Sequence, residues 1–414
     1  MYLIMLITNI KYLVNVREET KLLRGNELAH LPILENAFLK IKDSRIEDYG
    51  LMSELKESDF KDEIYDAKQV AVLPSWCDSH THLVFAATRE NEFIDKIKGL
   101  SYAEIAAKGG GILNSANKLN ETSEEILLEQ AQARLNELML LGTGAIEIKS
   151  GYGLSVEGEL KMLRVIQQLK KQNSIPIKST FLGAHAFPEN YKLDRNAYID
   201  VIIHEMLPKI AKENLADYID VFCEKGFFTQ QETEQICKAG IEYGLKAKIH
   251  ANQLNISGGV QAGSNTNAIS VDHLETIGDD EIQLLSQTNS PIATLLPGCS
   301  FFLNMQYAPA RQLIENNAAI ALASDYNPGS SPSGNMNFVV ALTCIQLKML
   351  PEEAINAATL NGAFAMELQN EVGSITKGKR ANLIFTQPIS SLSLLPYSFG
   401  TNLINKIMIN GNFI

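Results

Sequence analysis

The sequence predicts an α/β fold, a (β/α)8 TIM-like barrel with a small composite β-sandwich domain built from both chain ends. Three observations support this fold class. Apolar runs alternate with helical segments through the middle of the chain, as in a parallel sheet covered by helices. Shorter strand patterns separated by turn residues occupy both ends. Polar and ionisable side chains follow the central runs, where barrel enzymes carry their catalytic groups.

Residues 1–70 are assigned to the N-terminal part of the β-sandwich domain. The opening run Met1–Ile7 is apolar, but it lacks the basic leading segment and the small-residue cleavage site of a signal peptide. We therefore interpret it as a first strand. Ala37–Lys42 and Arg45–Glu47 flank a turn and predict a hairpin, so this end of the chain is expected to be a small β module.

Residues 71–368 are assigned to the barrel, the expected catalytic domain. Val72–Pro74 is interpreted as the start of the first barrel strand, which leads into Asp78–His82. The further apolar runs are Ala145–Ile148, Ser179–Leu182, Tyr218–Phe222, Lys246–Ile249, Ala268–Val271, Ile292–Leu295 and Ile320–Ala323. The helical segments between and after them include Glu124–Leu141, Glu157–Lys171, Gln231–Tyr243 and Pro351–Met366. Strands that alternate with helices in this way suit a closed barrel.

Residues 369–414 return to short strands. Ala381–Phe385 has a strand pattern, and Lys406–Ile409 leads into Asn410-Gly411, which is a hairpin signal. We therefore expect this segment to form the C-terminal part of the same β-sandwich domain.

Composition limits the classes of function. The 414-residue chain is 45% hydrophobic and 20% charged, which is ordinary for a globular protein with a sizeable core. Its formal net charge of −12 argues against a nucleic-acid partner. No run reaches the roughly 18 to 20 apolar residues that a membrane span requires. The five cysteines are odd in number and form no C-x-x-C pair, so we expect reduced thiols and a cytoplasmic protein.

Five of the seven histidines lie at or just beyond the predicted strand ends. The residues at these ends are His80, His82, Lys149, Ser150, His185, Glu224, His250, His273 and Asp325. If the strands close into a barrel, these side chains converge at one mouth. The sequence gives no reason to assign His30 or His204 to this or any other site.

The predicted metal ligands are His80, His82, His250 and Asp325. His80 and His82 share one strand face because they are two residues apart. Three imidazole nitrogens and one carboxylate oxygen suit zinc, or ferrous or ferric iron. Each residue alone has a simpler explanation, since a lone histidine after a strand is more often structural and Ser324–Gly329 has turn chemistry. Four such residues at one mouth together favour the metal site.

These residues also carry a family resemblance. Over essentially its whole length the chain resembles the amidohydrolase superfamily, and within it the imidazolonepropionase family of histidine degradation. The matching segments are Asp78–Phe85 with Arg89, Gly109–Ile112, Lys149–Leu154, Thr180–Ala186, Lys248–Gln253, Asp272–Leu274, Leu296–Gly298 and Ser324–Ser330. The H-x-H pair marks only the superfamily, whereas K-S-G-Y-G, F-L-G-A-H and D-Y-N-P-G-S are far more specific. Gly373–Leu383 resembles the strand pair that closes the superfamily's composite β domain.

The resemblance implies metal-dependent hydrolysis of the cyclic amide C–N bond of 4-imidazolone-5-propanoate, which yields N-formimino-L-glutamate. One divalent or trivalent metal ion per subunit, zinc or iron, lowers the pKa of its bound water, so that hydroxide attacks the ring carbonyl. Asp325 then accepts the proton and passes it to the leaving ring nitrogen. His273, which lies outside the ligand set, stabilises the oxyanion.

The resemblance also implies a set of substrate-binding residues. Arg89 is the candidate clamp for the propanoate carboxylate, although its chemistry alone favours a surface arginine. Tyr152 lies between two glycines that allow the backbone to approach a ligand, although tyrosines in turns more often serve packing. The other members are His185, Asn327, Gly329 and Ser330. Gln253 stands where part of the family has glutamate, and because a neutral amide cannot act as a general base, we assign it to substrate orientation.

Several alternatives remain open. Another cyclic amidohydrolase or a nucleobase deaminase would use the same ligands and differ only in its substrate-binding residues. A two-metal enzyme would need a carbamylated lysine after the fourth strand, where Lys225 is close but Glu224 holds the expected position. A metal-binding protein without turnover would not need both Asp325 and His273. Barrels of this type often pair through helix faces, so a homodimer is one expected assembly, but no sequence feature identifies such a face.

Overall fold

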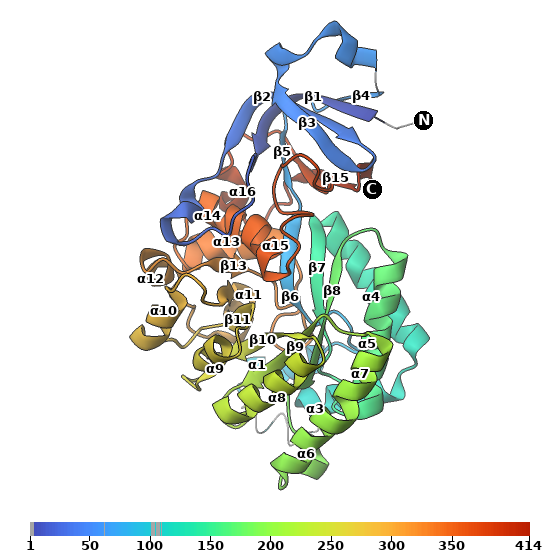
Figure 1. The fold of residues 1–414 in the computed structure, drawn as a ribbon, viewed down its shortest axis with the longest axis vertical. Helices are drawn as coiled ribbons and strands as arrows, with labels where there is room; N and C mark the ends of the chain where they lie inside the picture. Colours follow the sequence, from blue (N-terminus) through green and yellow to red (C-terminus); the bar gives the residue numbers. More distant parts are fainter. Residues whose placement is uncertain (1–3, 62, 101–103, 105–107, 109) are drawn as a thin grey trace.

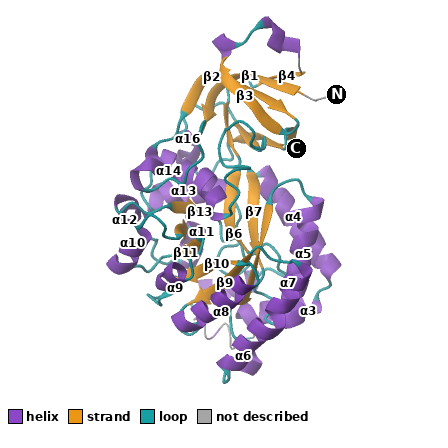
Figure 2. Cartoon of the chain, in the orientation of Figure 1, coloured by secondary structure: helices purple, strands orange, loops and turns teal. Residues whose placement is uncertain are grey.

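The computed structural model describes residues 4–61, 63–100, 104, 108 and 110–414. Within these residues, two eight-stranded sheets lie one above the other along the long axis of the molecule, with the barrel below and the sheet of the chain ends above (Figure 1). Helices surround the barrel, whereas the upper sheet is mainly strand and loop (Figure 2). None of the described helices combines the length and the apolar character needed to cross a membrane.

The lower sheet is the predicted barrel. Its strands are β6 (Trp76–Thr81), β7 (Thr143–Lys149), β8 (Ile177–Ala184), β9 (Tyr218–Cys223), β10 (Lys246–Ala251), β11 (Ser270–His273), β12 (Ile292–Leu295) and β13 (Ile320–Leu322). They follow one another in sequence order, and every neighbouring pair is parallel. Parallel neighbours need a crossover connection after each strand, so this order confirms the predicted (β/α)8 fold class.

Hydrogen bonds between the first strand and the segment after the last one bring the two edges of the barrel together. The Asp325 N–H donates to His80 O at 3.0 Å. The buried Asp78 carboxylate accepts from the Ser324 N–H at 3.0 Å and from the Ser324 hydroxyl at 2.6 Å. The segment with Asp325 is therefore fixed against the strand that carries His80.

The helices cover the outside of the barrel. They are α1 (Glu90–Ile97), α3 (Gly111–Glu121), α4 (Glu124–Leu140), α5 (Val156–Gln172), α6 (Arg195–Val201), α7 (Leu207–Glu213), α8 (Gln230–Glu242), α9 (Gly259–Asn265), α10 (Asp279–Leu285), α11 (Pro297–Leu303), α12 (Ala310–Glu315), α13 (Met336–Gln346), α14 (Pro351–Asn356), α15 (Gly362–Ala365) and α16 (Leu394–Tyr397). Two π-helical turns, Ile202–Met206 and Ala357–Asn361, join α6 to α7 and α14 to α15. Gly109, at the start of the glycine run, lies outside the described residues.

The predicted helical segments agree with the structure in all but one detail. Segments 124–141, 157–171 and 231–243 appear as α4, α5 and α8, and in each the residue before the helix is a serine or threonine whose hydroxyl accepts a hydrogen bond from the first turn. Segment 351–366 is helical but interrupted by the second π turn. A single wider turn changes the apolar spacing by one residue, which a helical pattern in sequence does not resolve.

The upper sheet combines both chain ends. Its strands are β1 (Ile4–Val14), β2 (Ile33–Lys42), β3 (Arg45–Leu51), β4 (Glu63–Asp66), β5 (Ala71–Pro74), β14 (Leu383–Thr386), β15 (Ile404–Ile409) and β16 (Asn412–Phe413). They are ordered β16-β15-β14-β5-β1-β2-β3, with β4 also paired to β1. β5 connects the two ends because it pairs with β1 on one side and with β14 on the other. The hairpin predicted at Asn410-Gly411 joins β15 to β16.

The start of the barrel differs from the sequence expectation. The sequence assigns Val72–Pro74 to the first barrel strand, but these residues belong to β5 of the upper sheet. Ser75 separates the two strands, and its N–H donates to Asn382 O at 3.0 Å. β6 begins only at Trp76. Both strands are buried, so the apolar pattern runs through the boundary without a break.

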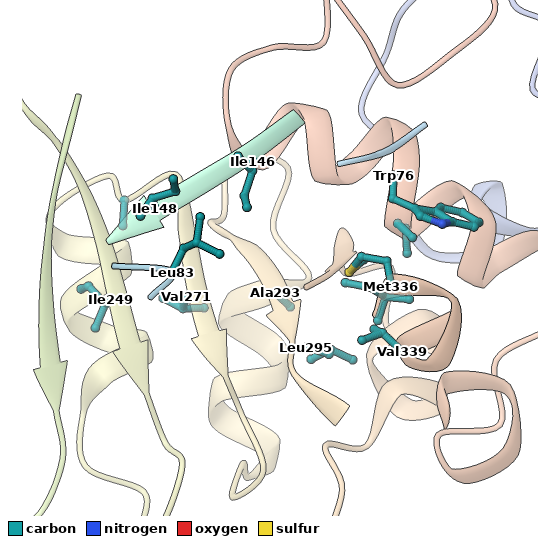
Figure 3. Packing of buried hydrophobic residues seen from close by; sticks show 14 of the residues in the cluster. Trp76, Leu83, Ile146, Ile148, Ile249, Val271, Ala293, Leu295, Met336 and Val339 are labelled. Carbon is teal, nitrogen blue, oxygen red and sulfur yellow. The ribbon is translucent and has the colours of Figure 1, made fainter. Parts of the chain in front are cut away.

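A continuous apolar core connects the barrel strands to the helices outside them. Figure 3 shows part of it, from Ile249 of β10 to Met336 and Val339 of α13. Trp76 is 2% exposed, and its indole N–H donates to Asn337 Oδ1 at 3.1 Å. Such close packing fixes the strand ends, so the side chains just beyond them have defined positions.

Candidate functional site

The structure brings the predicted ligands together at the carboxyl-terminal mouth of the barrel. His80 lies in β6, His82 directly follows that strand, His250 lies in β10 and Asp325 follows β13. His80 Nε2 is 3.5 Å from Asp325 Oδ1, and His82 Nε2 is 3.6 Å from the same oxygen. His250 Nε2 is 3.4 Å from His82 Nε2. All of these side chains are buried.

A buried carboxylate fixes the His80 ring. Nδ1 of His80 lies 2.6 Å from Asp272 Oδ2, which is the distance of a charge-assisted hydrogen bond and assigns the ring proton to Nδ1. The other ring nitrogen, Nε2, is buried and has no hydrogen-bond partner among the described residues. A buried polar atom without a partner is costly, and a cation in front of Nε2 removes that cost.

His250 also lies against a buried carboxylate. Its Nδ1 is 2.9 Å from Asp220 Oδ2, a close ion-pair contact that is not a hydrogen bond, and its backbone N–H donates to Asp220 Oδ1 at 3.1 Å. The Nε2 atoms of His250 and His82 lie 3.4 Å apart, and a proton or a cation between them makes this approach favourable. Together with the unpaired Nε2 of His80, these atoms form a donor set of imidazole nitrogens and one carboxylate oxygen that fits zinc or iron.

Burial keeps two of the ligand imidazoles neutral. The pKa of His80 is lowered well below its ordinary value by burial and by the charge of Lys149. The pKa of His82 is lowered in the same way by burial and by His185. Neutral imidazole is the form that binds a metal ion, so these two ligands are ready at neutral pH.

His273 lies beside the ligands but in a different electrostatic environment. Its ring centroid is 5.7 Å from that of His80 and 5.4 Å from that of His250. Burial lowers its pKa, but the Glu275 carboxylate, whose Oε1 is 3.4 Å from Nδ1, and neighbouring acids outweigh burial and raise the pKa to about 9. This raised pKa favours the protonated form of His273, which donates hydrogen bonds and suits a site where negative charge develops.

The turn after β13 orients the Asp325 carboxylate. The Ser330 hydroxyl donates to Asp325 Oδ2 at 3.2 Å. The Asn327 amide donates to Asp325 O at 2.6 Å and to Ser330 Oγ at 2.7 Å, while its oxygen accepts from the Gly329 and Ser330 N–H groups at 2.8 Å each. The structure therefore places Asn327 as a support of the turn, with its amide already hydrogen bonded.

Arg89 lies next to this turn, and within the described part of the chain its guanidinium makes one hydrogen bond. Its Nε donates to Ser115 Oγ at 2.9 Å, and its Cζ lies 5.9 Å from the centre of the Tyr152 ring. A Cβ at position 329 would lie only 2.5 Å from Arg89 Nη1, so a larger residue there would displace the guanidinium. Arg89 forms no ion pair with a described residue, which leaves its charge available for an anionic ligand.

Tyr152 and His185 form one wall beside His82. The buried Glu159 carboxylate accepts the Gly151 N–H at 3.0 Å and holds the loop that carries Tyr152. His185 stacks on His82 with ring centroids 5.3 Å apart, and its Nδ1 is 3.0 Å from Gly151 O. Gly151 has a φ of +111°, and a Cβ there would lie 2.8 Å from His185 Nδ1. Burial lowers the pKa of His185 to about 3, so this wall is neutral.

Gln253 lies in the loop after β10. Its Nε2 donates to Cys299 Sγ at 3.3 Å. The buried Glu224 carboxylate accepts the Leu254 N–H at 2.8 Å and so anchors this loop. Lys225 is exposed, and Glu224 is already used by the backbone, so the two-metal alternative lacks its lysine.

Sequence reasoning missed the buried charges beneath the ligands. They are Glu147, Lys149, Asp220, Lys248 and Asp272, and all lie within barrel strands. Of these, Lys149 and Asp272 directly follow predicted strands, and the sequence assigns neither a role. The available signal is an ionisable residue inside an apolar run, as in Ile219-Asp220-Val221, because a buried charge requires a partner.

A cavity of about 920 Å³ lies near the site and has Leu154 and Ala186 in its lining, but none of the residues assigned to the site lines it.

His204 lies away from the ligand cluster. Its side chain is 73% exposed in the π-helical turn 202–206.

Comparisons with known proteins place the chain in a family. The model of the Amidohydrolase family matches residues 71–414. A protein named imidazolonepropionase from Flavobacterium johnsoniae is 58% identical over 414 residues, which is 100% of each chain. Another from Christiangramia forsetii is 55% identical over 412 residues, which is 99% of this chain and 100% of the other.

The fold has solved counterparts. A crystal structure of an adenosine deaminase from Xanthomonas campestris with bound zinc has a TM-score of 0.71. The alignment covers 99% of this chain and 92% of that chain, at 15% sequence identity, so it shows a likeness of fold. The family model and the two relatives, which are more than half identical over nearly the whole chain, show the family to which the chain belongs. The chain belongs to the amidohydrolase family and, within it, to the imidazolonepropionases.

Proposed function

We propose that the chain hydrolyses the cyclic amide C–N bond of 4-imidazolone-5-propanoate to N-formimino-L-glutamate in histidine degradation. The observation that carries the proposal is a cluster of buried imidazoles and one carboxylate at the barrel mouth of a chain 58% identical to a named imidazolonepropionase. The cationic donors at this mouth, Arg89 and His273, suit a substrate that brings a carboxylate and gains negative charge during the reaction.

The proposed metal ligands are His80, His82, His250 and Asp325, which would hold one zinc or iron ion. When bound, such an ion lowers the pKa of a water molecule and polarises a carbonyl group. The zinc in the adenosine deaminase of the same fold supports this class of ion. Metal analysis of the purified protein distinguishes zinc from iron.

Asp325 and His273 are assigned to the movement of proton and charge. Burial raises the pKa of Asp325, although His273 partly offsets it, so the carboxylate can hold a proton and release it to the leaving ring nitrogen. Ser330 holds Oδ2, which directs Oδ1 towards His80 and His82. His273 donates a hydrogen bond to the carbonyl oxygen as negative charge develops there.

The substrate-binding residues retain their assigned roles as proposals, with two refinements. Arg89 binds the propanoate carboxylate, Tyr152 and His185 pack against the ring, and Gln253 orients it. Gly329 leaves room for the Arg89 guanidinium. The amide of Asn327 and the hydroxyl of Ser330 act through the turn that presents Asp325.

Replacement of Arg89 tests substrate capture. Arg89→Met is expected to raise KM by about 10- to 100-fold, the effect of losing one charge-assisted contact, with a much smaller change in kcat. Steady-state kinetics with the purified substrate measure both constants. Arg164→Met is the matched control, because Arg164 pairs with Glu213 on the surface and should leave KM unchanged. An unchanged KM in Arg89→Met would show that Arg89 does not bind the substrate carboxylate.

The proposed function itself is tested by product formation. Imidazolonepropanoate is generated enzymically and supplied to the full-length protein after zinc or iron loading. The expected result is loss of substrate absorbance with equimolar appearance of N-formimino-L-glutamate. Metal-loaded protein that forms none of this product would contradict the proposal.

A further inference from the structure

A single buried lysine contacts the carboxylates that hold two of the proposed metal ligands. Lys149 Nζ lies 2.8 Å from Asp220 Oδ2, 3.5 Å from Asp272 Oδ2 and 2.7 Å from Glu147 Oε1. The side chains of all these residues are 0% exposed. Lys149 ends β7, whereas Asp220 lies in β9 and Asp272 in β11, so the ammonium group joins three separate strands.

The same two carboxylate oxygens also contact the ligand histidines. Asp272 Oδ2 is 2.6 Å from His80 Nδ1, and Asp220 Oδ2 is 2.9 Å from His250 Nδ1. Asp220 Oδ1 additionally accepts the backbone N–H of His250 at 3.1 Å. The contacts therefore form a continuous chain that runs from His80 through Asp272, Lys149 and Asp220 to His250, with its hydrogen bonds at His80–Asp272 and Lys149–Asp220 and ion-pair contacts at the other two steps.

This chain sets the relative positions of two imidazoles on different strands. Without Lys149, the Asp220 and Asp272 carboxylates would face each other in a buried space and repel. Each could relieve the repulsion only by moving or by taking up a proton, and either change alters its contact with its histidine. Outer partners of metal-binding histidines commonly set ligand orientation in this way.

We propose that Lys149 is a positioning residue of the metal centre: it holds Asp220 and Asp272 at a fixed separation, and through them fixes His250 and His80. The inference rests on the proposed function, because it assumes that these histidines bind the ion. It assigns Lys149 no contact with substrate. Lys149, the first residue of the K-S-G-Y-G motif, thus has a role that is separate from that of the loop with Tyr152.

Charge and geometry predict opposite effects on metal affinity, which makes the proposal testable. Removing a buried positive charge near a cation site should tighten cation binding if Lys149 acts only through its charge. Removing the contact that positions two ligands should weaken cation binding if Lys149 acts through geometry. The sign of the change therefore separates the two explanations.

The experiment measures the zinc affinity of Lys149→Met in the full-length protein. The metal is first removed, and the zinc dissociation constant is obtained by competition with a chromophoric chelator. We expect zinc binding to weaken by about 10- to 100-fold, as for the loss of other outer partners of metal ligands. An affinity equal to or tighter than that of the wild type would overturn the proposal.

Lys248→Met is the matched control. Lys248 is also fully buried and pairs with Glu147, but it contacts backbone oxygens of Ser79 and Ala365 instead of the two carboxylates. This variant should lose stability to a similar extent and keep a zinc affinity close to that of the wild type. Equal weakening in both lysine variants would mean that the loss of stability alone accounts for the weaker binding, and the proposal would be wrong.

A second variant and a second measurement cover the case in which Lys149→Met does not fold. Lys149→Gln keeps a hydrogen-bond donor for one carboxylate, so it is expected to fold. Its loss of zinc affinity should be intermediate between those of the wild type and Lys149→Met. Cobalt-loaded Lys149→Gln should have an altered visible spectrum, because the ligand field reports imidazole geometry. Wild-type protein that binds no zinc would contradict the proposed function, whereas wild-type binding with unaffected Lys149 variants would contradict only this inference.

Discussion

Asp325→Asn is expected to lower kcat for ring hydrolysis by at least about 10³-fold, near the upper range for loss of a group that transfers protons. Asparagine has the same shape and keeps an oxygen towards His80 and His82, but it cannot accept and return a proton. The fold should persist. Burial raises the pKa of Asp325, so a neutral amide is tolerated at this position.

The measurement is steady-state kinetics at saturating substrate, with circular dichroism and metal analysis of the same sample. Because Asp325 is also a proposed ligand, kcat is determined at saturating zinc, so that loss of metal is separated from loss of proton transfer. Asp280→Asn, an exposed aspartate in the first turn of α10, is the control and should leave kcat unchanged. Asp325→Asn protein that keeps metal and turns over within tenfold of the wild-type rate would remove Asp325 from proton transfer.

Removal of the metal is expected to lower turnover by more than about 10³-fold and reloading is expected to restore it, because a bound ion supplies both the activated water and the polarised carbonyl. The structural reason is the unpaired Nε2 of His80 and the facing Nε2 atoms of His82 and His250. One cation in front of these atoms would satisfy all of them together.

Metal removal has a second readout that does not depend on catalysis. An ion that binds only the folded chain stabilises it by about 2.7 kcal/mol when its free concentration is 100 times its Kd. Tm should therefore fall on treatment with a chelator and rise again with added zinc or iron. The ion that restores both Tm and turnover at the lowest concentration identifies the preferred metal. Metal-free protein with unchanged Tm and full activity would contradict the assigned metal site.

The convergence of the strand-end residues was predictable from the sequence for a physical reason. A buried parallel strand contains a run of apolar residues, and polar side chains mark the end of that run, as where Ser324 and Asp325 follow Ile320–Ala323. A barrel closed from parallel strands brings all such ends to one mouth. The boundary of the strand and the closure of the sheet are thus enough to place His80, His82, His250 and Asp325 near one another.

The boundary between the two sheets could not be predicted in this way. Ala71–Pro74 and Trp76–Thr81 are consecutive buried strands, and only their partners differ. β5 pairs with β14, which lies more than 300 positions further along the chain. An apolar pattern carries no information about which distant strand completes a pair.

The hydrogen bonds that support the site were equally hidden. Asn327 stands in a segment that suggests ligand contact, but its amide is taken up by Asp325, Gly329 and Ser330. Asp220 stands inside an apolar run and Asp272 directly after one, where a sequence pattern shows that a buried charge needs a partner without showing which one. These assignments depend on side-chain orientation, and orientation follows from the packed structure.

The hydrogen bonds of Asp78 and His80 with Ser324 and Asp325 determine when the site can first exist during protein synthesis. His80 and His82 are synthesised early. Asp325 is added only after nearly all of the barrel has been translated. A nascent chain can offer at most a partial chelate, so tight metal capture has to wait until translation of the last strand is complete. A chain that stops before Ser324 would lack the Asp325 ligand. It would therefore bind the metal ion less tightly than the full-length chain.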